Sequence, residues 1–99
     1  MLLIQKTKKG DKLTISLEGQ LDTNSAQDLE EMIDDAIKGI RHLVFDLEKL
    51  TFISSAGLRI LLYAKKQIGG RGKMEIINIS HVVYEVFEVT GFAGMLGIE

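Results

Sequence analysis

The stretch from residue 50 to residue 58 reads Leu50-Thr51-Phe52-Ile53-Ser54-Ser55-Ala56-Gly57-Leu58. It leads from an apolar strand-and-loop run into an amphipathic helix that we expect to begin near Ala56, and it puts two adjacent hydroxyls at the junction. The N-terminus of a helix exposes unpaired backbone N–H groups and the positive end of the helix dipole. A serine there can cap the helix, which is the commoner role, or carry a phosphate group.

Strand and helix patterns alternate on both sides of this junction. Strand patterns cover Leu2 to Lys6, Lys12 to Glu18, His42 to Leu47 and Met74 to Ile79. Helical spacing of apolar residues covers Ala26 to Ile37, Ala56 to Ile68, and the segment between Ser80 and Gly91. The run from His42 to Leu47 is almost continuously apolar, as in strands that are buried on both faces.

The predicted order is therefore β-β-α-β-α-β-α, followed by an apolar tail from Phe92 to Ile98. Strands that alternate with helices of this length form right-handed crossovers and a largely parallel sheet. Lys9-Gly10-Asp11 indicates a hairpin turn, which adds one antiparallel pair. With no proline and no long polar stretch, the sequence predicts one α/β domain over residues 1–99, with a mixed sheet of about four strands packed against helices.

Composition narrows the functional classes. The 99 residues carry a formal net charge of −2, so no basic excess favours nucleic acid. There is no cysteine, which excludes disulfides and thiolate chemistry. No apolar run approaches the roughly 20 residues of a membrane-spanning helix, and we expect no direct membrane insertion. We expect a cytoplasmic protein.

Signatures of catalysis fail at specific positions. Gly72-Lys73 resembles the end of a phosphate-binding loop, but Gln67 stands where that motif needs glycine and Met74 where it needs a hydroxyl. The hydrolase elbow needs a glycine two residues before its serine, and neither Ser54 nor Ser55 has one. The two histidines, His42 and His81, show no ligand or base spacing. We expect no enzyme activity, no cofactor and no metal site.

Two acidic residues stand out from the solvated acidic face of the first helix. Asp22 follows a strand in a loop, where a helix cap or Asx turn and a functional role are equally good interpretations. Asp46 lies near the end of a buried strand, and we expect its carboxylate to accept backbone N–H groups of the following loop. Both could lie at the same sheet edge as Ser54 and Ser55.

The helix after the double serine is apolar on more than one side. Ile60, Tyr63 and Ala64 lie away from its core stripe, and Arg59, Lys65 and Lys66 supply charge. This pattern fits a docking surface with an apolar centre and a basic rim. The alternative, that a neighbouring helix or the C-terminal tail covers these residues, is equally consistent with the sequence.

Four motifs occur together and in order. They are Glu18-Gly19-Gln20-Leu21-Asp22, Val44-Phe45-Asp46-Leu47, Phe52-Ile53-Ser54-Ser55-Ala56-Gly57-Leu58 and Val89-Thr90-Gly91-Phe92. Over essentially its whole length the chain resembles the anti-sigma factor antagonists, whose fold is the STAS domain. This resemblance implies that the protein is a monomer when free. It also implies binding to an anti-sigma factor that is an ATP-dependent serine kinase, loss of that binding on phosphorylation, and recovery through a serine phosphatase.

The resemblance also implies the site. The phosphorylated serine of the family matches Ser55, and Ser54 stands where the family pattern has an acid, so Ser54 is the second candidate. The expected partner-contacting residues are Asp22, Thr23, Ser54, Ser55, Ala56, Gly57, Arg59, Ile60 and Tyr63. A phosphoserine adds about −1.5 to −2 charges, which a helix N-terminus tolerates but a desolvated interface does not. The alternatives are a STAS scaffold or transport-complex subunit without this switch and, more remotely, a small nucleotide-binding protein.

Overall fold

The computed structural model describes residues 1–97. Its elements are β1 (Leu2–Lys9), β2 (Lys12–Leu21), α1 (Thr23–Ala36), β3 (His42–Ile53), α2 (Ser55–Ile68), the short 3-10 helix η1 (Gly69–Arg71), β4 (Lys73–Ile77), α3 (His81–Thr90) and α4 (Phe92–Leu96). The strands form one sheet in the order β1-β2-β3-β4. β1 pairs antiparallel with β2, and the other two pairs are parallel. The predicted mixed sheet and element order are confirmed.

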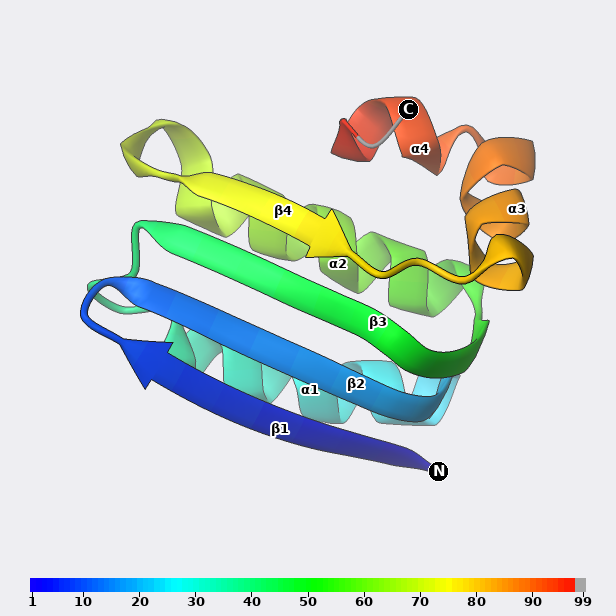
Figure 1. Ribbon diagram of the computed structural model, residues 1–99, viewed down its shortest axis with the longest axis horizontal. Helices are drawn as coiled ribbons and strands as arrows, with labels where there is room; N and C mark the ends of the chain where they lie inside the picture. The colour runs from blue at the N-terminus through cyan, green and yellow to red at the C-terminus, as the bar shows by residue number, and fades with distance from the viewer. Residues whose placement is uncertain (98–99) are drawn as a thin grey trace.

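The two long helices α1 and α2 lie side by side on one face of the sheet, and in the described chain no helix covers the other face (Figure 1). Alternation along β2 sends Leu13, Ile15 and Leu17 into the core beneath these helices. Phe45 of β3 and Phe87 of α3 are the largest fully buried side chains. The carboxyl ends of the parallel strands therefore meet at one end of the sheet, where the helices begin.

β3 is longer than the sequence predicts. The expected strand ended at Leu47, whereas β3 continues to Ile53 and pairs there with Leu21. Register shifts between Ser16 and Glu18 and between Gly19 and Gln20 allow this continuation. The shifts break the regular alternation, which is the signal that reveals a strand in sequence.

Other boundaries also differ from expectation: β1 runs to Lys9, β2 runs to Leu21 and α1 begins at Thr23. β4 ends at Ile77 rather than Ile79, because Asn78 adopts a left-handed conformation with φ 57°. The apolar tail, for which no secondary structure was predicted, forms the short helix α4, with Ala93 and Leu96 buried. The last tail residue expected to be apolar, Ile98, lies outside the described residues.

Candidate functional site

The site lies where β2 and β3 end and α1 and α2 begin (Figure 1). The backbone N–H of Ser54 donates to the carbonyl of Leu21 at 2.9 Å, so the two strand ends are tied together. Asp22 follows Leu21 and Ser55 follows Ser54, and this bond therefore brings the two predicted functional segments to one edge of the sheet.

Asp22 caps α1. Its carboxylate accepts the backbone N–H of Ser25 at 2.9 Å, and the Ser25 hydroxyl accepts the backbone N–H of Asp22 at 2.9 Å. These two bonds form a capping box. The bond from the Ser25 N–H, with a second bond from the Ser25 hydroxyl, lowers the pKa of the Asp22 carboxyl from its ordinary value of 3.8. The capping interpretation is confirmed, and the ionised Asp22 carboxylate lies toward the start of β1, where it lines a pocket with Met1 and Leu2.

Ser25 was missed in the sequence interpretation. It is the one polar residue that is buried in the described chain, and its hydroxyl also donates to the carbonyl of Gln20 at 3.0 Å. The sequence does contain the spacing of a capping box, which is a cap residue followed three positions later by a second hydrogen-bonding side chain. That motif is usually written with Glu or Gln at the third position.

The two adjacent serines have different environments. Ser54 is the N-cap of α2, is half-buried, and its hydroxyl oxygen accepts the backbone N–H of Gly57 at 3.3 Å. Ser55 is the first residue of the helix, is exposed, and has no side-chain hydrogen bond within residues 1–97. The Ser55 hydroxyl is thus free at the positive end of the α2 dipole, whereas the Ser54 hydroxyl is already engaged in the fold.

Gly57 is a packing residue. A Cβ atom built on it would lie 2.7 Å from Cγ of Leu21 and 2.9 Å from Cγ1 of Ile53. Gly57 is buried in the free chain, and its expected contact with a partner stays a prediction. Its missing side chain lets α2 begin against the ends of β2 and β3.

The apolar side of α2 is smaller than the sequence suggests. Ala64 is fully buried, and the Tyr63 hydroxyl donates to the Asp34 carboxylate of α1. This bond is the main cause that raises the pKa of Tyr63 above its ordinary value of 10.0. Lys65 donates from Nζ to the carbonyl of Met95 in α4 at 3.1 Å. The neighbouring helices therefore cover part of this side, as the alternative interpretation held.

Most of the expected contact residues around the starts of α1 and α2 remain accessible. Thr23, Ser55 and Arg59 are exposed, and Asp22, Ser54, Ala56, Ile60 and Tyr63 are half-buried. Phe52, at the end of β3, is also exposed and was not among the expected contact residues. We call these expected contact residues that remain accessible the switch patch: Asp22, Thr23, Ser54, Ser55, Ala56, Arg59, Ile60 and Tyr63.

Asp46 does not lie at this edge. It sits in the middle of β3, paired with Ile77, and its side chain accepts the Glu48 backbone N–H and the Asn78 side-chain amide, both at 3.1 Å. The expected bond to a following backbone N–H is confirmed, but the expected location beside the serines is wrong. Because β3 runs on to Ile53, the residues after Asp46 are strand and not loop.

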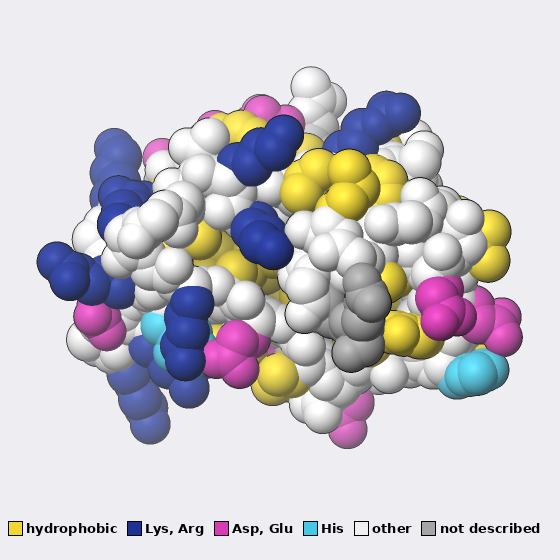
Figure 2. All heavy atoms as spheres, turned by 90° about the horizontal axis from the view of Figure 1, so that it is seen from above, with side chains coloured by type: hydrophobic (Ala, Val, Ile, Leu, Met, Phe, Trp, Pro, Cys, Tyr) yellow, Lys and Arg dark blue, Asp and Glu magenta, His cyan; other side chains and the backbone are white. Residues whose placement is uncertain are grey.

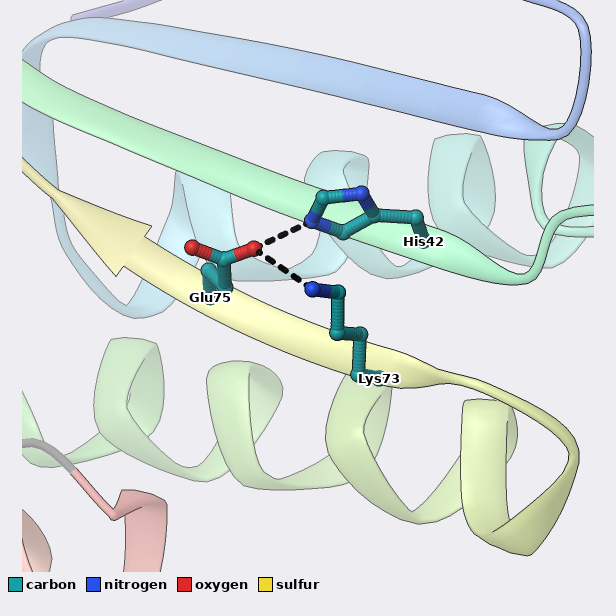
Figure 3. Close-up of polar contacts among 3 residues, drawn as sticks. All are labelled: His42, Lys73 and Glu75. Carbon is teal, nitrogen blue, oxygen red and sulfur yellow. Dashed lines mark hydrogen bonds and ion pairs between the residues drawn. The ribbon is translucent and has the colours of Figure 1, made fainter.

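The charged cluster at the other end of β3 is structural. His42 contacts Glu75 on the neighbouring strand, and Lys73 lies 3.6 Å from the same carboxylate (Figure 3). The hydrogen bond from His42 is the main cause that lowers the pKa of the Glu75 carboxyl from its ordinary value of 4.5. Within residues 1–97 no three His, Asp or Glu side chains gather as metal ligands. The same residues hold no helix long and apolar enough to span a membrane.

Known proteins share both the sequence pattern and the fold. The family model of the STAS domain matches residues 4–99. The chain is 36% identical over 88 residues to the putative anti-sigma factor antagonist BtrV of Bordetella bronchiseptica, a match that covers 87% of this chain and 76% of that protein. The chain therefore belongs to the STAS-domain family.

Solved structures agree on the fold. An anti-sigma factor antagonist from Mycobacterium paratuberculosis matches with a TM-score of 0.86 at 21% identity, over 96% of this chain and 82% of that one. The unphosphorylated form of the anti-sigma factor antagonist SpoIIAA matches with a TM-score of 0.82 at 23% identity, over 93% and 84% of the two chains. The phosphorylated form of SpoIIAA from Bacillus matches with a TM-score of 0.73 at 23% identity, over 96% and 86%.

Proposed function

We propose that this protein is an anti-sigma factor antagonist. It would bind an anti-sigma factor with serine kinase activity through the switch patch, and phosphorylation of Ser55 would end that binding. The observation that carries the proposal is the free, exposed hydroxyl of Ser55 at the start of α2, beside the segment that begins with Asp22. The relationship to BtrV supports the general function, and the existence of SpoIIAA in both phosphorylated and unphosphorylated forms supports the switch.

Ser55 is a better substrate than Ser54 for physical reasons. The Ser54 oxygen caps Gly57, so a kinase acting on it would have to break a bond that holds the start of α2. The Ser55 hydroxyl can enter a kinase site without any change in the helix. A phosphate on Ser55 would then sit near the first backbone N–H groups of α2, where the helix dipole stabilises negative charge by roughly 0.3 to 1 kcal/mol.

The same phosphate would oppose partner binding. It adds about −1.5 to −2 charges at the sheet edge that also carries the ionised Asp22 carboxylate, and an interface that removes water from both groups makes their repulsion stronger. Each 1.4 kcal/mol lost in this way weakens affinity about tenfold. The partner is therefore released by local repulsion and desolvation, with the fold unchanged. A serine phosphatase would restore binding.

A pull-down from lysate of the native host tests the proposal. The baits are the unmodified protein, Ser55→Asp, and Gln5→Glu as a matched control that adds one negative charge on the exposed edge strand β1. We expect the unmodified bait and Gln5→Glu to hold a small ATP-binding kinase, and Ser55→Asp to lose it. If all three baits hold the same transporter or assembly subunit, the protein is a STAS scaffold and the proposed switch is wrong.

A further inference from the structure

The outer edge of β4 is open in the described part of the chain. β4 is the last strand in the sheet order and pairs only with β3. The backbone N–H of Lys73 donates to the carbonyl of Arg41 at 2.8 Å, so Lys73 directs its backbone groups toward β3. In a parallel pair the direction alternates along the strand, and the N–H and C=O groups of Met74 and Ile76 therefore point away from the sheet. Such an edge is a template for a further strand.

A groove with a volume of about 560 Å³ runs beside this edge. Its apolar lining comes from α2, β4 and α4, and consists of Leu62, Ile68, Met74 and Met95. The Met95 side chain is 54% exposed, so the apolar surface is accessible to a partner. We call this feature, with the outer edge of β4, the edge groove.

The edge groove is cationic. Lys65, Lys66 and Lys73 line it, and none of its lining residues is acidic. Lys65 donates to the Met95 carbonyl and Lys73 lies 3.6 Å from the exposed Glu75 carboxylate, whereas Lys66 has no such contact in the described residues. Figure 2, which views this side of the molecule, shows apolar atoms between Lys and Arg side chains, with acidic and His side chains at one end of the same surface. The chain as a whole has a net charge of −2, so the lining of the edge groove is more positive than the chain on average. An acidic ligand with aliphatic side chains is the chemical complement.

We propose that the edge groove binds an extended acidic segment of a partner protein, which adds as a fifth strand beside β4. Its backbone would bond to Met74 and Ile76, its aliphatic side chains would pack on Leu62 and Met95, and its carboxylates, on the other face of the added strand, would lie near Lys73. This is strand addition to a sheet edge, in which backbone bonds supply affinity and alternate side chains supply specificity.

The edge groove is separate from the switch patch. Ser55 begins α2, whereas Lys65 and Ile68 lie near its end, and a helix of 14 residues spans about 21 Å. A partner segment in the edge groove would therefore leave Ser55 accessible. Binding there is expected to be independent of the phosphorylation state, so this inference stands or falls apart from the proposed switch.

The test uses three synthetic peptides and the full chain. The first is the acidic heptapeptide Glu-Val-Glu-Ile-Glu-Val-Glu with blocked ends, and the second replaces each Glu by Lys. The third is the acidic peptide with N-methyl groups on all seven residues, which leaves no backbone N–H to donate to a strand edge in either strand orientation. Backbone amide shifts in ¹H–¹⁵N NMR spectra of the protein report where each peptide binds and how tightly.

We expect the acidic peptide to shift the amides of Met74 and Ile76 and the methyl groups of Leu62 and Met95. The basic and N-methylated peptides should bind at least tenfold more weakly. The double variant Lys66→Glu/Lys73→Glu should also lose about tenfold or more, whereas Lys6→Glu/Lys8→Glu on the opposite edge strand, with the same change in net charge, should not. Ser55→Asp should leave the affinity unchanged.

Three results would overturn the proposal: no shifts at Met74 and Ile76, equal binding of acidic and basic peptides, or full affinity of the N-methylated peptide. If the groove variant does not fold, salt gives the same information with the unmodified chain. Raising the ionic strength from about 0.1 M to about 1 M shortens the Debye length from about 10 Å to about 3 Å and should weaken binding of the acidic peptide. Affinity that is insensitive to salt would contradict the role of the lysines.

Discussion

The Ser54 backbone N–H and the Leu21 carbonyl are joined by a 2.9 Å hydrogen bond. This bond links the last residue of β2 to the residue that caps α2, across more than thirty positions of sequence. Because Asp22 caps α1 immediately after Leu21, the two longest helices begin side by side. The ends of β2 and β3 therefore fix the positions of Asp22 and of Ser55, the proposed phosphate acceptor.

Substitution of Gly57 by alanine is expected to destabilise the fold. The new Cβ would meet Leu21 and Ile53, both buried, at less than 3.0 Å, and overpacking of this kind costs about 1–3 kcal/mol. The gain in helix propensity, roughly 0.5–1 kcal/mol, does not offset it. Urea denaturation followed by circular dichroism measures the change. Gly70→Ala is the control, since nothing lies within 4 Å of a Cβ there, and an equal effect of the two variants would disprove the packing role.

The two serines should respond differently to alanine. Ser54→Ala removes the oxygen that accepts the Gly57 N–H, and loss of a serine cap costs typically about 1 kcal/mol. Ser55→Ala removes an exposed hydroxyl without a partner in residues 1–97 and should change the free energy of unfolding by less than about 0.5 kcal/mol. Chemical denaturation of both variants distinguishes them. A larger loss at Ser55 than at Ser54 would reverse our assignment of the cap.

Stability in acid should depend on Glu75. The hydrogen bond from His42 lowers the pKa of this carboxyl in the folded chain, so the unfolded chain binds the proton more readily. The resulting stabilisation is complete above the ordinary value of 4.5 and is lost as the pH falls through the lowered pKa. Glu75→Gln should therefore be less stable at neutral pH and show a flatter loss of stability below pH 4.5.

Glu31→Gln is the matched control for that experiment. Glu31 is exposed on α1 and makes no ion pair or side-chain hydrogen bond within the described residues. Asp22, whose pKa is also lowered, is retained in both variants and contributes equally to their acid unfolding. Identical pH profiles for Glu75→Gln and Glu31→Gln would show that the contact between His42 and Glu75 does not stabilise the fold.

The contact between α1 and α2 can be followed through Tyr63. The chain has two tyrosines, so Tyr84→Phe leaves Tyr63 as the single phenol. Its hydrogen bond to Asp34 keeps the proton on the hydroxyl, and ultraviolet absorbance should give a pKa above 10.0. Adding Asp34→Asn should lower the pKa toward that ordinary value. An unchanged titration would mean that Asp34 and Tyr63 are not in contact in solution.

Much of the fold was predictable because its signals are local. Alternation along β2 and helical spacing after Ser55 indicate the elements directly, and Gly10 identifies the hairpin. The end of β3 was not predictable, because its bulged pairing interrupts the alternation on which a strand prediction depends. The left-handed Asn78 and the short helix α4 depend on contacts with distant residues.

The sequence predicts that the candidate site lies at the starts of α1 and α2, but it does not reveal the structural role of each residue there. Either serine could cap α2 as far as the sequence shows. The hydrogen bond from the Gly57 N–H to the Ser54 hydroxyl oxygen identifies Ser54 as the cap. The burial of Gly57 and Ala64 depends on packing partners in other elements. The edge groove combines residues from α2, β4 and α4, and no local pattern in the sequence reveals such a combination.

Phosphate mapping of the partner-bound and free pools tests the central claim most directly. Trypsin cleaves after Lys49 and Arg59, so the peptide from Leu50 to Arg59 holds Thr51, Ser54 and Ser55 together, and fragmentation in the mass spectrometer distinguishes them. The protein is isolated from its native host as two pools, one associated with a partner and one free. We predict phosphate on Ser55 in the free pool and unmodified peptide in the bound pool. Equal phosphate on Ser55 in both pools, phosphate on another residue, or none in either pool would contradict the proposed switch.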